Sequence, residues 1–267
     1  MIQKKIFKKG SKTYYWSTFF FPKKVKRDVT VLYAFVRVAD DFVDQVPPRK
    51  ELYYAFKDEY YRLIAGGHGG PKVIRDFVQL QHRKKFEQGW VDAFFASMEM
   101  DLAHHEYQTM DDTLRYMYGS AEVIGLMMNR VLGVSHKADF GAQLQGRAMQ
   151  YINFIRDVKE DMVLGRTYIP LDIRRATAVD VLRADRHTGR LLRRELDRYH
   201  QWQKEARTYY KYIPRRYRVA IMTAADMYKW TALQIQKDPR KAFKRKVKPS
   251  KLRILLAGLR NLVKCYV

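Results

Sequence analysis

The sequence predicts an all-α fold in which residues 1–267 form a single domain, and three observations favour it. Apolar residues recur three and four positions apart through long segments, which is the pattern of one helix face. No segment alternates apolar and polar residues as a half-buried strand would. Glycine (14 residues) and proline (8 residues) are too sparse for a turn-rich β fold.

The expected helices follow one another between recognisable breaks. An apolar stripe at helical spacing predicts one of them, and it consists of Leu32, Phe35, Val36, Ala39 and Val43. Further helices are expected to carry residues 150–161 and to run from 251 to 267. The breaks are a glycine-rich loop at 66–71, softer breaks at 133–141, 165–172 and Pro214, and a basic connector at 238–249.

The composition points to a negatively charged partner. The chain carries 52 lysines and arginines against 28 acids, a formal net charge of +24. Nucleic acid, an anionic membrane surface or a phosphorylated substrate would all fit. Cys265 is the only cysteine, so no disulfide can form within the chain. Because no apolar segment is long enough to cross a membrane and no secretory signal is visible, we expect a cytoplasmic protein.

The first cluster of functional interest lies on the helix expected near residue 40. Tyr33, Arg37, Asp40, Asp41 and Asp44 fall within an arc of roughly 100° on a helical wheel. Three carboxylates crowded within about one turn repel one another unless a cation neutralises them. Mg²⁺ prefers oxygen ligands and combines a few carboxylates with substrate phosphates. For this cluster alone, a solvated acidic face is the alternative.

A second polar stripe occurs much later in the chain. Asn153, Asp157 and Asp161 are four residues apart and climb one helix face, with Gln150 and Glu160 beside them. Acidic stripes are unexpected in so basic a protein, and helical bundles build metal sites from side chains that face one another across the core. Together the two stripes favour a shared divalent-metal site over two solvated surfaces.

Departure of diphosphate from an allylic prenyl diphosphate is the chemistry that uses such a site. Metal ions and basic side chains would pull on the leaving group, and the resulting carbocation must be kept from water. Aromatic residues, whose ring faces stabilise cations, make up 14% of the chain. Core packing accounts for most of them individually.

The two motifs resemble those of the squalene/phytoene synthase family. They are YAFVRVADDFVD at 33–44 and QYINFIRDVKED at 150–161, followed by GRTYIP at 165–170. Segments 10–22 and 116–125 also resemble the family, so the likeness covers nearly the whole chain in order. It implies the isoprenoid synthase helical bundle with a central cavity.

The resemblance also implies roles for individual residues. Several Mg²⁺ ions would be bound from two walls, by Asp40, Asp41 and Asp44 and by Asn153, Asp157 and Asp161. The implied catalytic residues are Asp40, Asp44, Asp157, Asp161, Tyr33 and Arg37. The implied substrate-binding residues are Ser11, Lys12, Thr13, Tyr14, Arg37, Asn153, Arg156, Tyr168, Tyr228, Arg245 and Lys246. Gly10 stands where some members have histidine.

The implied reaction joins two prenyl diphosphates head to head through a cyclopropylcarbinyl diphosphate. Formation of phytoene from geranylgeranyl diphosphate is the favoured form, since the chain lacks the C-terminal membrane helix of many squalene-forming members. Squalene or dehydrosqualene formation from farnesyl diphosphate is the alternative, and NADPH would be needed only for squalene.

The sequence argues against three other kinds of protein. A chain-elongating prenyl synthase would show a second DDxxD motif, and a terpene cyclase would prefer Ser or Thr and Glu in the second stripe. A nucleic-acid-binding protein would explain the basic clusters, but no binding motif accompanies them, so no nucleic-acid partner is expected.

The last helix is basic and amphipathic, which predicts peripheral contact with an anionic membrane. Monomer and homodimer both remain open.

Overall fold

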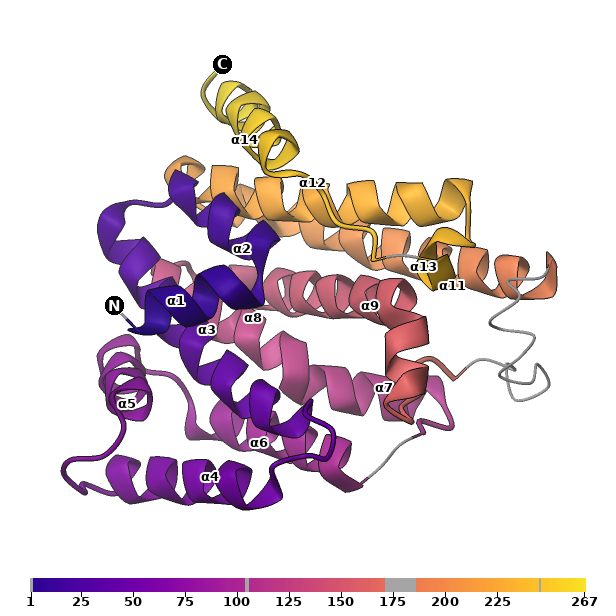
Figure 1. Ribbon diagram of the computed structural model, residues 1–267. Coiled ribbons are helices and arrows are strands. Elements are labelled where there is room, and N and C mark those ends of the chain that lie inside the picture. Colours follow the sequence, from indigo (N-terminus) through magenta and orange to yellow (C-terminus); the bar gives the residue numbers. More distant parts are fainter. Residues whose placement is uncertain (1, 104–105, 171–185, 245) are drawn as a thin grey trace.

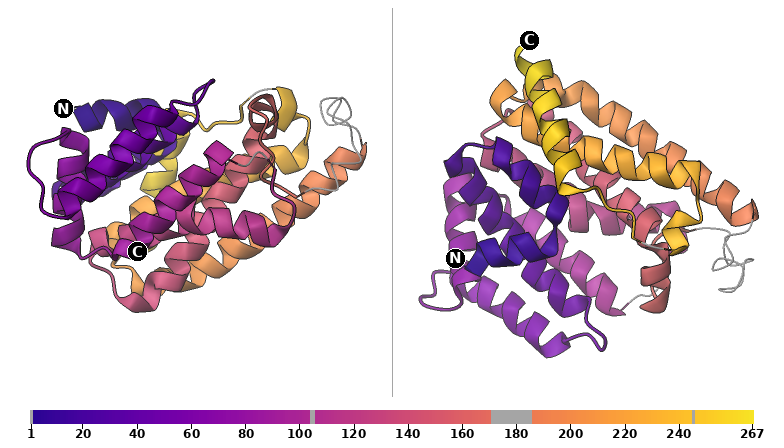
Figure 2. Two further views of the ribbon diagram at one scale, coloured as in Figure 1. Left: turned by 90° about the horizontal axis from the view of Figure 1, so that it is seen from below. Right: turned by 45° about the horizontal axis from the view of Figure 1, so that its top comes forward.

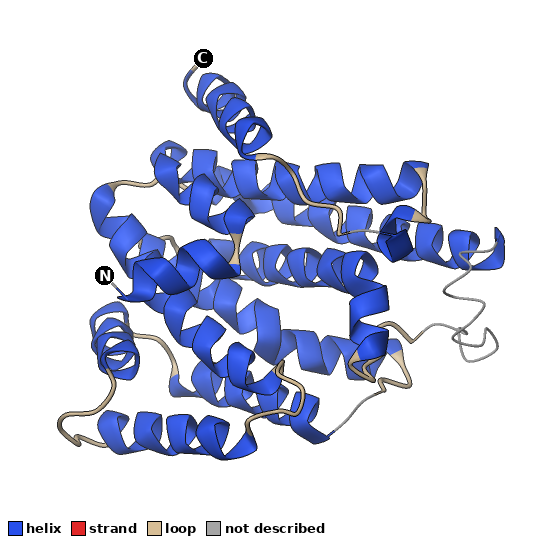
Figure 3. Cartoon of the chain, in the orientation of Figure 1, coloured by secondary structure: helices blue, strands red, loops and turns tan. Residues whose placement is uncertain are grey.

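The computed structural model describes residues 2–103, 106–170, 186–244 and 246–267 (Figure 1). The described residues are overwhelmingly helical and form no strand (Figure 3). An isolated bridge joins Glu106 to Thr167. The all-α prediction is therefore confirmed.

The N-terminal part of the chain forms short helices followed by four long ones. Their bounds are α1 (Ile2–Gly10), α2 (Lys12–Ser17), η1 (Thr18–Phe20), α3 (Lys23–Val43), α4 (Lys50–Ile64), α5 (Lys72–Lys84) and α6 (Gln88–Ala103). The rest of the described chain forms α7 (Met110–Met117), η2 (Tyr118–Glu122), α8 (Val123–Leu132), η3 (His136–Ala138), α9 (Asp139–Val163), α11 (Arg186–Thr208), η5 (Tyr209–Tyr212), α12 (Arg215–Lys237), α13 (Lys241–Lys244) and α14 (Lys251–Tyr266).

Most of the predicted breaks lie between helices. The loop at 66–71 joins α4 to α5, and three of its glycines have positive φ angles, which residues with a Cβ rarely adopt. Pro214 immediately precedes α12. Two expectations were wrong in detail. The break after Gly133 ends at Ala138, because Gly141 already belongs to α9. The basic connector contains a single helical turn, α13.

The two helices with acidic motifs are the longest of the early and middle chain. In α3 the predicted apolar stripe is buried except at Val36, which is partly buried and lines a cavity, and Phe35 stacks on Phe77 of α5 with ring centroids 3.7 Å apart. In α9 a corresponding face is buried through Tyr151, Ile152 and Ile155. Because the apolar face of each helix packs in the core, the acidic face of the same helix is directed away from these core contacts.

Close contacts hold α9 against α8 and against the turn η2 that precedes it. A Cβ at Gly125 would lie 2.2 Å from the backbone oxygen of Ala142, and one at Gly146 would lie 2.3 Å from that of Ala121. Any larger residue would force the two helices apart. Between α7 and α8 the chain makes a π-helical turn, η2, of the kind often found at functional sites.

Two large groups of buried apolar side chains fill the molecule. The first involves α1 to α6 and α8, and the second involves α7, α9, α11 and α12. α14 lies over α12 and beside the N-terminal helix α2 (Figure 2). Within the described residues, no helix combines the length and the apolar character needed to cross a membrane.

Candidate active site

One cavity of about 660 Å³ contains nearly all the residues predicted to act together. Asp40 and Asp44 reach it from the C-terminal end of α3, and Asp157 and Asp161 reach it from the C-terminal half of α9. Asn153 lines the cavity one turn before Asp157. The two acidic stripes therefore open onto the same space.

The α3 wall is organised by an arginine. Arg37 Nη1 donates to Asp40 Oδ2 at 2.9 Å, and the same guanidinium pairs with Asp41. Asp41 is not among the cavity-lining residues, and its side chain is 48% exposed. Burial raises the pKa of Asp40 well above its usual range, and the negative charge of Asp44 raises it further.

The α9 wall carries its own cations. Arg156 Nε donates to Asp157 Oδ1 at 2.8 Å, and Lys246 Nζ lies 3.4 Å from the same oxygen. Burial raises the pKa of Asp161 to about 8, and the charges of Asp157 and Asp44 add to the effect. Since Asp44 belongs to the opposite wall, the two walls are close enough to influence one another electrostatically.

The cavity has the donor set of a site for hard divalent cations. Its walls present carboxylates, and the side-chain oxygen of Asn153 is buried without a hydrogen-bond partner. Within the described part of the chain, no three His, Cys, Asp or Glu side chains converge as a closed metal cage. Mg²⁺ suits this arrangement, because it keeps several waters and takes remaining ligands from substrate phosphates.

A buried arginine that the sequence analysis left without a role supports the acidic end. Arg166 donates to Asp44 Oδ1 and to the backbone oxygen of Val43, both at 2.8 Å. It lies directly after Gly165, whose positive φ angle ends α9. Its position just beyond the second motif was the available sequence signal.

Asp101 is a second buried group that sequence reasoning missed. Its carboxylate accepts hydrogen bonds from Tyr116 at 2.6 Å and from Tyr168 at 2.7 Å. Burial raises the pKa of Asp101 to about 6, although Arg166 acts in the opposite direction. Tyr168, a predicted substrate-binding residue, is thus held in a network beneath the acidic end. Asp101 stands between Met100 and Leu102 in the sequence and belongs to no recognised motif.

The predicted N-terminal residues form the rim of the cavity. Ser11 caps α2 by accepting a hydrogen bond from the backbone nitrogen of Tyr14 at 3.2 Å, and Lys12 and Thr13 also line the cavity. The rings of Tyr14 and Tyr228 are 5.6 Å apart, and those of Tyr14 and Tyr33 are 6.5 Å apart.

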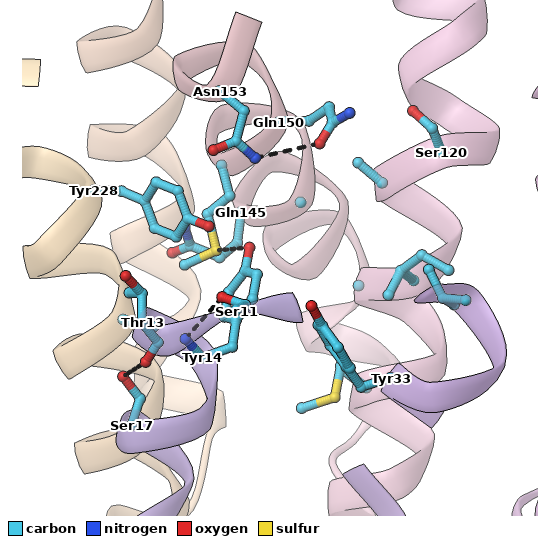
Figure 4. A pocket seen from close by; sticks show the side chains of 18 of the residues that line it. Ser11, Thr13, Tyr14, Ser17, Tyr33, Ser120, Gln145, Gln150, Asn153 and Tyr228 are labelled. Atoms are coloured by element: carbon cyan, nitrogen blue, oxygen red, sulfur yellow. Dashed lines mark hydrogen bonds between the residues drawn. The ribbon is translucent and has the colours of Figure 1, made fainter. Parts of the chain in front are cut away.

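The hydroxyl groups of these three tyrosines turn toward the same part of the cavity (Figure 4). Burial raises the pKa of each one, so each hydroxyl stays neutral and able to donate a hydrogen bond.

The predicted basic contact near the C-terminal end is described in part. Lys246 lines the cavity, pairs with Asp157 and Glu160 of α9, and is followed by a second lining lysine, Lys248. Arg245, the other candidate, lies outside the described residues.

The opposite end of the cavity is largely apolar. Its walls there come from η1, α3, α8, η5 and α12, through residues that include Phe21, Val29, Leu132, Ile213 and Ile221. The cavity therefore offers charged groups at one end and room for a hydrocarbon chain at the other.

Comparison with known proteins agrees with this geometry. The squalene/phytoene synthase family profile matches residues 7–253. A 15-cis-phytoene synthase of a Paracoccus species is 31% identical over 258 residues, which cover 91% of this chain and 84% of the relative. The 15-cis-phytoene synthase of Pantoea ananas is 26% identical, over 93% of this chain and 87% of its own.

Solved structures show the same fold. A dehydrosqualene synthase superposes with a TM-score of 0.88 at 25% identity, over 99% of this chain and 96% of its own. A squalene synthase from Alicyclobacillus acidocaldarius gives a TM-score of 0.78 at 20% identity, over 88% and 92% of the two chains. The chain therefore belongs to the squalene/phytoene synthase family, and it is an all-α prenyltransferase.

Proposed function

We propose that the protein joins two molecules of geranylgeranyl diphosphate head to head to give phytoene and two diphosphates. The observation that carries this proposal is one cavity with different ends. Two acidic walls and several basic side chains line one end, and apolar side chains line the other. The phytoene synthases among its relatives support the choice of product.

The charged end would hold the diphosphate groups. Arg37, Arg156, Lys246 and Lys248 supply positive charge there, and neutral tyrosine hydroxyls can donate hydrogen bonds to phosphate oxygens. Mg²⁺ ions held by Asp40, Asp44, Asn153, Asp157 and Asp161 would act as Lewis acids on the leaving group. Asp41, which is not among the lining residues but pairs with Arg37, would act through Arg37 as a positioning residue.

The reaction then proceeds in two ionisations. The C1–O bond of the first substrate breaks, diphosphate leaves with the electron pair, and the C2–C3 double bond of the second substrate captures the cation. Loss of one proton closes the cyclopropane ring. A second ionisation, rearrangement and loss of another proton give the conjugated triene. The apolar walls exclude water, which would otherwise trap each cation as an alcohol.

Product analysis tests the proposal. The purified protein is incubated with Mg²⁺ and either the C20 or the C15 prenyl diphosphate, and hydrocarbons are extracted and identified. A C40 triene from the C20 substrate is expected. An absence of hydrocarbon from both substrates, with the protein folded, would contradict the proposal.

A second candidate has a specific observation in its favour. The dehydrosqualene synthase structure matches almost the whole chain. If the C15 substrate is preferred, the product without reductant would be dehydrosqualene. Squalene formed only when NADPH is added would identify the third possibility.

We further propose that the enzyme works in the cytoplasm at an anionic membrane surface. Its net charge of +24 attracts such a surface. The hydrocarbon product is insoluble in water and would have to pass from the cavity into the bilayer. Light scattering would distinguish a monomer from a homodimer.

A further inference from the structure

The last helix presents its leucines to the outside. Leu252, Leu256, Leu259, Val263 and Tyr266 are each between 54% and 66% exposed. They are spaced at four, seven, eleven and fourteen residues from the first, so they form one stripe that is about 21 Å long. An apolar stripe of this length is uncommon on the free surface of a soluble protein.

The opposite face of α14 explains this orientation. It is buried through Ile254, Ala257, Gly258, Asn261 and Cys265. A Cβ at Gly258 would lie 1.9 Å from the ring of Phe20, so the body of the protein accepts only the small-residue face. Among the described residues, the leucines of the stripe therefore stay more than half exposed.

Basic residues surround the leucine stripe. Lys251 lies 4.0 Å above the ring of Trp16, Arg253 lies 4.8 Å from that of Trp230, and Arg260 donates to Asp226. Phe19, which precedes Phe20, is 50% exposed, and Lys26 Nζ lies 3.6 Å from the centre of its ring. Lys23 and Lys24 begin α3 shortly after these two phenylalanines in the chain.

The two ends of the chain build this surface together. Residues 1–27 contain nine lysines and arginines and no acid, and residues 239–267 contain ten and no acid. These segments meet where α14 packs on α2 (Figure 2). Much of the net charge of +24 therefore comes from the part of the chain that also exposes the leucines.

We propose that the leucine stripe of α14 and the lysines at the start of α3 form one docking surface for an anionic lipid bilayer. An apolar stripe bordered by lysine and arginine is the pattern of a helix that lies in the interface of such a bilayer. A second copy of the chain fits less well, because two copies would bring like-charged borders together.

The surface lies beside the apolar end of the cavity. Phe21 lines that end and directly follows Phe19 and Phe20. Ile221 also lines it, and its neighbour Met222 is in contact with Cys265 of α14, with the sulfurs 3.8 Å apart. Docking here would place the hydrocarbon end of the cavity near lipid, a consequence that rests on the proposed function.

The test is sedimentation with vesicles of phosphatidylcholine alone or with 30% phosphatidylglycerol as the probe, at low and at high salt. The wild-type protein should sediment with the anionic vesicles and be released by salt. Leu256→Ser with Leu259→Ser should weaken binding at least about tenfold. Lys23→Glu with Lys24→Glu should weaken it by at least about the same factor.

Matched controls lie on α4, on the opposite side of the molecule (Figure 1). Leu52→Ser with Tyr54→Ser removes two side chains that are 46% and 44% exposed. Arg49→Glu with Lys50→Glu makes the same change in charge as the α3 variant. Both controls should bind vesicles as the wild type does.

Two outcomes would overturn the proposal. One is equal sedimentation of the wild type and the leucine variant. The other is a dimer, detected by light scattering without vesicles, that dissociates in the leucine variant. Turnover with detergent-dispersed substrate is measured in parallel. The leucine variant should keep wild-type turnover there, so loss of docking and failure of the proposed reaction give different results.

Discussion

Asp226 links three helices, and its removal should destabilise the protein measurably. Asp226 belongs to α12. Its carboxylate accepts a hydrogen bond from Arg207 of α11 at 2.7 Å, and two more from Arg260 and Asn261 of α14 at 2.8 Å and 2.9 Å. Its side chain is only 12% exposed. Asp226→Ala removes all three acceptor contacts at once.

The size of the effect follows from the burial of the partners. The Asn261 amide is fully buried and would lose its closest acceptor, which costs about 1–3 kcal/mol. Arg207 is one-third exposed and adds about 1 kcal/mol, whereas Arg260 is more than half exposed and adds little. A total near 3 kcal/mol corresponds to a fall in Tm of about 6–12 °C for a chain of this size.

The same contacts make the effect depend on pH. Burial alone would raise the pKa of Asp226, but the hydrogen bonds from Arg207 and Asn261 outweigh it, and the pKa is lowered. A lowered carboxylate pKa contributes stability that is present above the unfolded-state pKa, about 3.9, and is lost as pH falls through the folded-state pKa. The difference between wild type and variant should be full at pH 7 and should shrink as the pH falls below about 4.

Urea unfolding at pH 7 and thermal melts down to pH 3.5 measure both effects. Glu205→Ala, which removes one exposed carboxylate from α11, is the control for net charge. If Asp226→Ala is no less stable than Glu205→Ala, or if the difference persists unchanged in acid, the assigned contacts do not stabilise the fold as argued.

The remaining predictions concern the active site and its scaffold. Asp40→Asn and Asp157→Asn should each lower hydrocarbon formation by about 10²–10³-fold with little change in Tm, and near-normal turnover in both would remove the metal assignment. Arg166→Lys keeps the charge but loses the paired contacts to Asp44 and Val43, so kcat should fall about tenfold or more; an unchanged kcat would show that the pair is dispensable. Gly125→Val should lower Tm strongly because its Cβ would lie 2.2 Å from the Ala142 oxygen, whereas Gly89→Ala, with nothing within 4 Å, should be tolerated; equal melting of the two would contradict the tight α8–α9 contact.

Much of the fold was predictable because helical periodicity is a local property. The stripe through Leu32, Phe35 and Ala39 is buried as expected, and the same spacing rule directs Asp40, Asp44, Asp157 and Asp161 to one cavity. Asp41 shows the limit of the rule. A helical wheel groups it with Asp40, but its side chain, paired with Arg37, is 48% exposed and is not among the lining residues.

What could not be predicted depends on which helices become neighbours. Asp101 carries no motif, and Arg166 lies in the GRTYIP segment without an expected role; their contacts arise only where α9, α3 and α6 converge. The last helix is the clearest case. Its leucines have the spacing of a core face, yet the close contact of Phe20 with Gly258 selects the small-residue face for burial. The amphipathic pattern of residues 251–267 predicts membrane contact, but which face packs on the protein is decided by this contact with Phe20.

The most direct test of the central claim measures whether both acidic walls bind the same metal–diphosphate unit. Thermal shifts are recorded with Mg²⁺, with an unreactive prenyl thiodiphosphate, and with both together. We predict that the two ligands stabilise the wild-type protein cooperatively, and that Asp40→Asn on α3 and Asp157→Asn on α9 each abolish this cooperative stabilisation. If either variant keeps the full cooperative shift, the two walls do not share the bound ions, and the account of the site is wrong.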